Sequence, residues 1–230
     1  MSSRNVVVVG AGGVLGEALC REFVPDSRVV ALRRPGSAPV KVEGVRTFAL
    51  QFAEPNTASE ALAGVFEDDA VDLMIHNAAE LRTGSFNELT VADFRATWDA
   101  SVATAVATAR AVLPGMVARG RGCLIFCGAT ASIRGGSGFA AFSSAKFALR
   151  GLAQSLAREY QPRGIHVAHV ILDGLISGSA SARRFGSEVQ QVSDTQLMPA
   201  KVARTCRTLA EQDRSCWSHE VDLRPWTERF

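Results

Sequence analysis

The stretch Phe126 to Arg150, FCGATASIRGGSGFAAFSSAKFALR, decides the fold of this chain. It ends an apolar strand pattern, crosses a loop of small residues and enters a helical pattern that carries Phe142 and, four residues later, Lys146. Residues four apart share one face of a helix, so a molecule over that face would meet a ring and a cation together. In an arbitrary helix Phe142 would be core and Lys146 a solvated charge. The remaining chain favours a nucleotide-binding fold with this helix beside the ligand.

Length and composition fit one globular domain spanning residues 1–230, because 47% of the residues are hydrophobic and 21% are charged. A net charge of +2 gives no sign of a nucleic-acid or acidic partner. No apolar run reaches the ~18 residues of a membrane span, and the run from Met1 to Val9 is too short for a signal peptide. We therefore expect a cytoplasmic protein that does not enter a membrane.

The cysteines are odd in number and lie in apolar or helical contexts: Cys20, Cys123, Cys127, Cys206 and Cys216. Cys123 and Cys127 share one strand pattern, and no second pair has metal-ligand spacing. Free thiols in a reducing compartment are therefore predicted, with no metal site and no disulfide framework.

Short apolar runs alternate with amphipathic helical stretches along the chain. The strands are predicted at Asn5–Val9, Arg28–Leu32, Val45–Leu50, Val71–His76, Cys123–Cys127, Ile165–Ile171 and His219–Leu223. The helices are predicted at Val14–Phe23, Thr57–Phe66, Thr90–Met116, Phe142–Tyr160 and Pro199–Glu211. Most strand runs are continuous, which is typical of strands covered on both faces, so the pattern predicts a doubly wound α/β sheet.

The first strand runs into a turn with glycines at Gly10, Gly12 and Gly16, followed by a helix. Glycine lets the backbone bend and lets a pyrophosphate approach the helix N-terminus, whose unpaired N–H groups favour anions. The other interpretation is a glycine-rich turn without a ligand. Its place after a strand and before a helix favours nucleotide binding.

Arg33 and Arg34 end the second strand, where dinucleotide folds place the group that faces the adenosine ribose. An acidic residue there accepts from the 2′-hydroxyl of NAD, whereas arginines complement a 2′-phosphate. The sequence therefore predicts NADP(H) rather than NAD(H), unless both arginines are merely solvated. After the fourth strand, Asn77, Ala78 and Ala79 are small enough for close passage of a cofactor.

Four motifs occur in order along the whole chain: GAGGVLG after the first strand, HNAA after the fourth, FSSAK at the head of a long helix and IHVAHVILDG on the sixth strand. The chain thereby resembles the short-chain dehydrogenase/reductase family of Rossmann-fold, NAD(P)(H)-dependent oxidoreductases. The resemblance implies a single domain with seven mostly parallel strands in the order 3-2-1-4-5-6-7 and helices on both faces. It also implies a homodimer or homotetramer built through helices 90–116 and 142–160.

The cofactor motifs depart from the family's pattern at several positions. Val9 and Val14 replace a threonine and a glycine of the turn, Gln51 replaces the adenine-side aspartate, and Asp173-Gly174 replaces a Pro-Gly pair. The residues expected to contact the cofactor are Gly10, Gly12, Gly13, Val14, Leu15, Gly16, Arg33, Arg34, Gln51, Phe52, Asn77, Ala78, Ala79, Lys146, Asp173, Gly174 and Ile176.

At the catalytic positions, this sequence departs further from the residues that the resemblance implies. Phe142 stands at the family's tyrosine, Ala129 at its serine and Ser101 at its relay asparagine, while Lys146 is retained. Phenylalanine and alanine side chains carry no donor or acceptor, so the usual proton donor is missing. In the family the lysine binds the nicotinamide ribose, a role that does not need the tyrosine. Thr130 and Ser132 are the nearest hydroxyls that can orient a substrate oxygen, and Thr130 is the one expected to contact substrate, although loop hydroxyls often bond their own backbone.

These features lead to an NADPH-dependent oxidoreductase as the first hypothesis. It would be a reductase of a small molecule that needs no tyrosine acid, namely a carbonyl, imine or enone compound. The alternative is a catalytically silent NADP(H)-binding sensor or partner subunit, and a redox-neutral lyase or isomerase is a third possibility. Residues 177–194 are expected to form the substrate loop, where Arg183 and Arg184 would meet an acidic group or solvent.

Overall fold

The computed structural model describes residues 4–50, 60, 62, 71–186 and 195–228. Its strands are β1 (Arg4–Val9), β2 (Ser27–Arg33), β3 (Val45–Ala49), β4 (Leu73–His76), β5 (Gly122–Cys127), β6 (Ile165–Leu172) and β7 (Glu220–Leu223). Its α-helices are α1 (Val14–Phe23), α3 (Val91–Trp98), α4 (Thr104–Arg119), α5 (Ala140–Tyr160), α6 (Ala180–Phe185) and α7 (Pro199–Ala210). Short turns of other helix types are η1 (Asp99–Ala103), η2 (Thr130–Ser132) and η3 (Gln161–Arg163).

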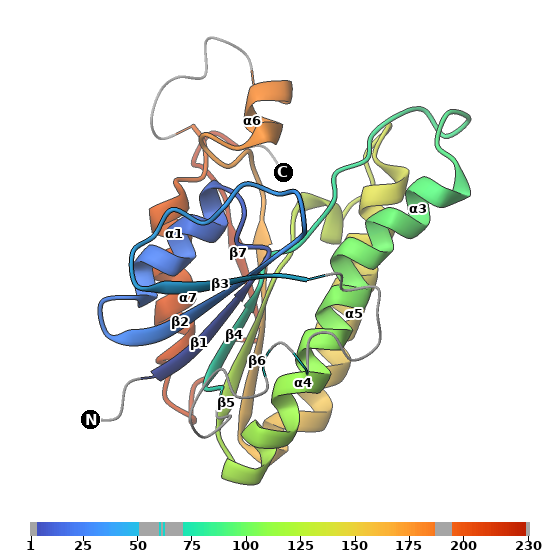
Figure 1. The fold of residues 1–230 in the computed structure, drawn as a ribbon. Helices are drawn as coiled ribbons and strands as arrows, with labels where there is room; N and C mark the ends of the chain where they lie inside the picture. Colours follow the sequence, from blue (N-terminus) through green and yellow to red (C-terminus); the bar gives the residue numbers. More distant parts are fainter. Residues whose placement is uncertain (1–3, 51–59, 61, 63–70, 187–194, 229–230) are drawn as a thin grey trace.

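The seven strands form one sheet in the order β3-β2-β1-β4-β5-β6-β7, and all of its pairings are parallel (Figure 1). This confirms the predicted strand order and fold class. Parallel neighbours need a crossover between them, and right-handed crossovers bring the carboxyl ends of all strands to one edge. The order reverses between β1 and β4, and in such sheets the crevice for a ligand opens at that point.

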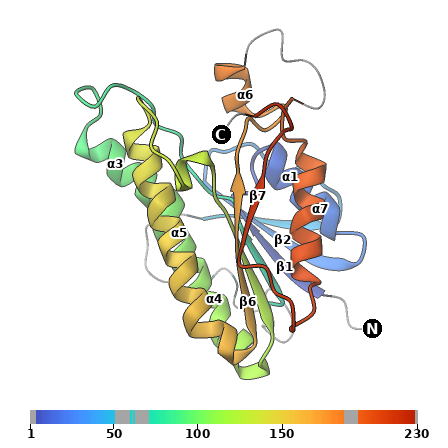
Figure 2. The same ribbon diagram turned by 180° about the vertical axis from the view of Figure 1, so that it is seen from behind.

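Helices cover both faces of the sheet, with α1 and α7 on one face and α4 and α5 on the other (Figures 1 and 2). The valines of β1 alternate between the two layers: Val7 and Val9 pack toward α4 and α5, whereas Val6 and Val8 pack toward α1 and α7. All four are fully buried. A strand with a core on each face reads as a continuous apolar run, which explains the VVVV of β1.

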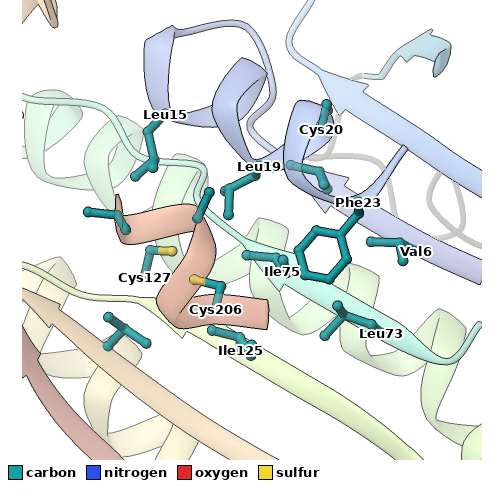
Figure 3. Packing of buried hydrophobic residues seen from close by; sticks show 14 of the residues in the cluster. Val6, Leu15, Leu19, Cys20, Phe23, Leu73, Ile75, Ile125, Cys127 and Cys206 are labelled. Carbon is teal, nitrogen blue, oxygen red and sulfur yellow. The ribbon is translucent and has the colours of Figure 1, made fainter. Parts of the chain in front are cut away.

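Cys127 on β5 and Cys206 on α7 hydrogen-bond to each other within the α1–α7 layer, where Figure 3 shows them side by side. Cys20 and Cys123 are buried in the same layer, and Cys216 is exposed. All five cysteines are free thiols, as the sequence predicts.

The predicted helix Thr90–Met116 is one continuous helical rod interrupted by a π-turn. Thr90 caps it, since its Oγ1 accepts from Asp93 N at 3.2 Å and Asp93 Oδ2 accepts from Thr90 N at 2.9 Å. The π-turn η1 divides α3 from α4, and the rod ends at Gly120, whose φ of 61° suits a left-handed cap. Pattern analysis assigned the helix correctly but did not detect the π-turn.

Helix Val91–Arg119 is long and apolar enough, by length and composition, to cross a membrane. Half of its most apolar window is buried inside the protein, however, and Ala105, Val112 and Met116 pack in the core. The buried half of this window therefore belongs to the protein core.

Most other boundaries differ from the sequence prediction by one or two residues. Helix α5 begins at Ala140 instead of Phe142, and β4 begins at Leu73 instead of Val71. The predicted helix Thr57–Phe66 falls almost wholly outside the described residues.

Two glycines of the first turn differ in the space around them, which gives a test of the packing. A Cβ on Gly16 would lie 2.4 Å from the Ala11 Cα, whereas one on Gly13 would meet nothing within 4 Å. We expect Gly16→Ala to lower the free energy of unfolding by about 1–3 kcal/mol because backbone has to move. Gly13→Ala should cost about 1 kcal/mol or less. Urea unfolding of both variants checks this, and equal losses would contradict it.

Candidate active site

A cleft of about 1080 Å³, here called the main cleft, opens at the carboxyl edge of the sheet between α5 and the loops after β1, β4, β5 and β6. The predicted site residues that line it are Gly12, Gly13, Val14, Leu15, Asn77, Ala79, Ala129, Thr130, Phe142, Lys146, Gly174 and Ile176. A side pocket of about 440 Å³ adjoins it, since Gly12, Gly13 and Ala79 line both. Gly10, Arg34 and Ala78 line the side pocket. Residues far apart in sequence are thus brought together as the topology requires.

Four predicted residues line neither space. Gly16 packs against Ala11, Ser101 is fully buried, Asp173 lies behind Thr130, and Arg33 bonds its own loop. Gln51 and Phe52 lie outside the described residues.

The N-terminus of α1 points its first-turn N–H groups toward the main cleft without a side-chain cap. Gly13 is the N-cap residue in an extended conformation, and none of the described side chains caps this end with a hydrogen bond. Gly10 has φ of +80°, and a Cβ there would approach Ala78 N to 2.5 Å, so only glycine fits. Asn77 Nδ2 donates to Gly10 O at 3.0 Å and ties the β4 end to this turn. Open N–H donors at a helix N-terminus fit the pyrophosphate of a dinucleotide.

Val14 stands where the resemblance to the family leads us to expect a glycine of the turn. Its side chain is 38% exposed, lines the main cleft and comes near Gly178, where an added Cβ would lie 3.6 Å from Val14 Cγ1.

The two arginines after β2 have separate partners. Arg33 Nη1 donates to Ser37 O at 2.8 Å, which holds the loop in place. Arg34 Nη1 donates to Glu80 Oε2 at 2.8 Å in the side pocket, and Arg82 Nε donates to Glu80 Oε1 at 2.7 Å. Glu80 is a feature that the sequence analysis missed. The guanidinium of Arg34 is 64% exposed, so it still presents donors to a phosphate.

Lys146 is the buried cation of the main cleft. Its side chain is only 3% exposed, its Nζ donates to Cys127 O at 2.8 Å, and it lies 5.7 Å from the centre of the Phe142 ring. The predicted sharing of one face by Phe142 and Lys146 is therefore confirmed. Burial lowers the pKa of Lys146 to about 8.

The loop after β5 holds the positions that flank Phe142. Ala129 N donates to Ser132 Oγ at 3.0 Å, so the Ser132 hydroxyl serves the loop backbone. Thr130 Oγ1 donates to Asp173 Oδ1 at 2.6 Å. Ser143, beside Phe142 on α5, also lines the cleft, and its Oγ finds no partner among the described residues.

Two buried histidines lie below the cleft and line neither space. His76 is fully buried on β4, and burial lowers its pKa to about 3. His169 on β6 is paired with Glu220 at 3.1 Å, and burial lowers its pKa to about 4. An imidazole nitrogen of His169 lies so close to Gly128 that a Cβ there would approach it to 2.3 Å. Both rings are therefore neutral packing elements at pH 7.

The far wall of the main cleft comes from the segment after β6. Phe185 of α6 packs on Phe139 with ring centres 5.8 Å apart, and Arg183 and Arg184 also line the cleft. Arg183 Nη1 donates to Gly178 O at 2.7 Å. Residues 187–194 of the predicted substrate loop lie outside the described residues. Among the residues that are described, no cluster of His, Cys, Asp and Glu has the form of a metal site.

A parallel sheet in this order, with a glycine turn after β1, defines a Rossmann-type fold. The chain belongs to the short-chain dehydrogenase family, whose model matches residues 4–184.

Several oxidoreductases are similar to this chain over most of their own length. Acetoacetyl-CoA reductase of Cupriavidus necator is 27% identical over 93% of this chain and 93% of its own. A short-chain dehydrogenase of known structure from Rhodopseudomonas palustris is 32% identical, with a TM-score of 0.79 over 98% of this chain and 100% of its own. A serine dehydrogenase solved with NADP⁺ shares the fold, with 21% identity and a TM-score of 0.85 over 98% of this chain and 96% of its own.

The depressed pKa of Lys146 gives a prediction about stability. The pKa of Lys146 is about 8 in the folded protein and 10.5 for an unperturbed lysine. Between pH 8 and pH 10.5, Lys146 is protonated in the unfolded chain and mostly neutral in the folded protein, so the free energy of unfolding rises with pH. At pH 7 both states are protonated and the cost of burying the ammonium is fully present. We expect Lys146→Met to raise the free energy of unfolding at pH 7 by about 1–2 kcal/mol, because the buried charge is removed. This figure already includes the opposing loss of the hydrogen bond from Lys146 to Cys127 O.

This gain should shrink toward pH 10 in urea unfolding measurements. Lys201→Met is the matched control, because Lys201 is exposed on α7 and should change stability by less than about 0.5 kcal/mol. A Lys146→Met protein less stable than wild type at pH 7 would contradict the prediction.

Proposed function

We propose that this protein is an NADP(H)-dependent oxidoreductase that acts on a small molecule in the main cleft. The observation that carries the proposal is the buried ammonium of Lys146, held at the cleft by Cys127 O. A buried charge costs stability, so its place beside the open N-terminus of α1 supports a binding role. The bound cofactor would supply or take up hydride, while Lys146 would hold its nicotinamide ribose and the α1 turn its pyrophosphate.

The preference for the phosphorylated cofactor rests on the side pocket. Arg34 lines it together with the carboxylates of Glu80 and Asp99, and Arg82 pairs with Glu80. Because the Arg34 side chain is 64% exposed, its guanidinium can still donate to a 2′-phosphate. NADP is present in solved structures that share this fold, including the serine dehydrogenase.

The substrate class follows from what the cleft lacks. Phe142 and Ala129, which stand at the tyrosine and serine positions of the resemblance, offer no proton and no hydrogen bond. We infer a reductase of carbonyl, imine or enone compounds that does not depend on a tyrosine acid. An iminium needs no proton on receiving hydride, and an enone takes hydride at its β-carbon, so both reduce the demand for an acid.

The alternative is a catalytically silent NADP(H)-binding sensor or partner subunit. The combination of Lys146 with Phe142 and Ala129 favours it, because binding would persist where proton transfer does not. Binding of NADPH without turnover of any carbonyl, imine or enone in a panel would support this alternative.

We also propose a cytoplasmic homodimer or homotetramer formed through helices 90–116 and 142–160. Trp98 and Phe147 on these helices are 45% and 43% exposed, which leaves apolar surface for a second copy. Light scattering that gives a monomer mass would end this idea.

The cofactor preference is tested at Arg34. We expect Arg34→Gln to weaken NADPH binding by about 10- to 100-fold and to leave NADH binding unchanged, because a charge-assisted contact to the 2′-phosphate is lost. Fluorescence titration with both reduced cofactors measures this. Arg95→Gln on the exposed face of α3 is the control. Tighter binding of NADH than NADPH by the wild type would contradict the proposal.

The missing acid is tested by restoring it. We expect Phe142→Tyr with Ala129→Ser to raise NADPH-dependent reduction of acetophenone by about 10²-fold or more, since a positioned acid and an oxyanion donor are introduced. The single variant Ala129→Ser is the control and should give little gain. If the double variant binds NADPH as the wild type does and still shows no gain, the cleft does not align a carbonyl with the cofactor.

A further inference from the structure

Glu80, on the segment after β4, lies between two arginines at the side pocket. Its Oε2 accepts from Arg34 Nη1 at 2.8 Å, and its Oε1 accepts from Arg82 Nε at 2.7 Å. Arg82 Nη2 also lies 2.6 Å from the same Oε1. Each carboxylate oxygen of Glu80 thus serves a different guanidinium, so one contact can break while the other remains.

The two contacts of Glu80 are held in different ways. Arg82 is only two residues from Glu80 on the same segment, whereas Arg34 reaches Glu80 from the loop after β2, 46 residues away in the sequence. The Glu80 side chain is 19% exposed, against 50% for Arg82 and 64% for Arg34. Glu80 is therefore the most buried of the three side chains, and Arg34 has the most surface left for a ligand.

The charges that line the side pocket do not favour a phosphate by themselves. Among the described residues that line it, Arg34 is the basic one, and Glu80 and Asp99 are acidic. Arg82 is not among the described residues that line the side pocket or the main cleft, but its ion pair with Glu80 balances the charge of the group. A phosphate in the side pocket would therefore depend on an arginine that does not line it.

We propose that Arg82 is a positioning residue for cofactor selection, which holds the Glu80 carboxylate and thereby frees Arg34 to bind a ribose 2′-phosphate. The inference rests on the proposed function, because it needs a nicotinamide dinucleotide whose adenosine end lies in the side pocket. It adds to that function the means by which the protein chooses between the phosphorylated and the unphosphorylated cofactor.

The exchange at Arg34 involves only hydrogen bonds and ion pairs. When a 2′-phosphate arrives, Arg34 turns its donors from Glu80 Oε2 to the phosphate oxygens, and Glu80 Oε1 keeps its contact with Arg82. An exposed carboxylate–guanidinium pair is weak, whereas a phosphate dianion forms a stronger charge-assisted contact, so the exchange favours the phosphate. Without Arg82, the negative charge of Glu80 would rest on Arg34 alone and would repel the incoming phosphate.

Glu80 also affects the binding of the unphosphorylated cofactor. A carboxylate accepts a hydrogen bond from a ribose 2′-hydroxyl but repels a 2′-phosphate. Removal of the Arg82 charge should therefore move the preference toward NAD(H), and removal of the Glu80 charge should move it toward NADP(H). The two residues act in opposite directions through one guanidinium, that of Arg34.

Two nucleotides that differ only in the 2′-phosphate test the proposal: adenosine 2′,5′-bisphosphate and adenosine 5′-monophosphate. Calorimetry on each variant gives the ratio of the bisphosphate affinity to the monophosphate affinity. We expect Arg82→Gln to lower this ratio by about three- to tenfold and Glu80→Gln to raise it by a similar factor, because each removes one partner of an exposed ion pair. Arg82→Lys should stay within about twofold of the wild type, because it keeps the positive charge beside Glu80.

A double-mutant cycle distinguishes positioning from direct contact with the phosphate. In the Glu80→Gln protein, Arg82→Gln should change the ratio by less than about twofold, because the carboxylate that Arg82 holds is gone. Arg158→Gln is the control, since it removes the same charge from the exposed end of α5 that lies away from the main cleft, and it should leave the ratio unchanged. An unchanged ratio in Arg82→Gln, or an equal loss with and without Glu80, would overturn the proposal.

Titration of the wild type and Arg82→Gln with NADPH and NADH separates this inference from the proposed function. If the wild type binds NADPH and Arg82→Gln leaves the ratio of the two cofactor affinities unchanged, the positioning role is wrong and the proposed function stands. If the wild type binds the bisphosphate but neither cofactor, the proposed function fails, and the nucleotide ratios still decide the role of Arg82. If no nucleotide and no cofactor binds, both fail.

Discussion

The arrangement of this site depends on one buried ammonium. Lys146 reaches from α5 to the last carbonyl of β5, at Cys127, and lies almost wholly buried in the wall of the main cleft, beside the Phe142 ring. That bond joins α5 to the sheet edge, where α5 and its N-cap residue Phe139 place Phe142 and Ser143 in the cleft wall. Burial disfavours the charged form of Lys146, so a packed apolar side chain at this position would make the folded state more stable.

The sheet explains why such a cation can serve a cofactor. Parallel strands end at one edge, so the turn after β1, the Asn77 segment after β4 and the Thr130 loop after β5 lie together although they are far apart in sequence. The uncapped N-terminus of α1 and the Lys146 ammonium are then two positive features on one crevice. Under the proposed function, the α1 N-terminus would receive the pyrophosphate and Lys146 would hold the ribose of the nicotinamide.

The layers could be predicted because the central strands are buried on both faces, which leaves a visible run such as VVVV in β1. The strand order was implied by the resemblance to the family, because the spacing of apolar runs does not set it. The Phe142–Lys146 pair could be predicted because helical spacing alone sets it. The contacts of Arg34 with Glu80 and of Thr130 with Asp173 could not, because the partners are 46 and 43 residues apart. Spacing carries no information at such distances. The π-turn at η1 was also missed, since its residues fit an ordinary helical pattern.

In this cleft, ligand binding and proton donation depend on different residues. The Lys146 ammonium and the uncapped N-terminus of α1 can hold a cofactor whatever side chain stands at position 142. The Phe142 ring and the Ala129 methyl group have no proton to give, and the Thr130 hydroxyl donates to Asp173 Oδ1, whose carboxylate is paired with Arg224 and Arg134. A substrate that needs little proton donation therefore suits this cleft better than a simple ketone does.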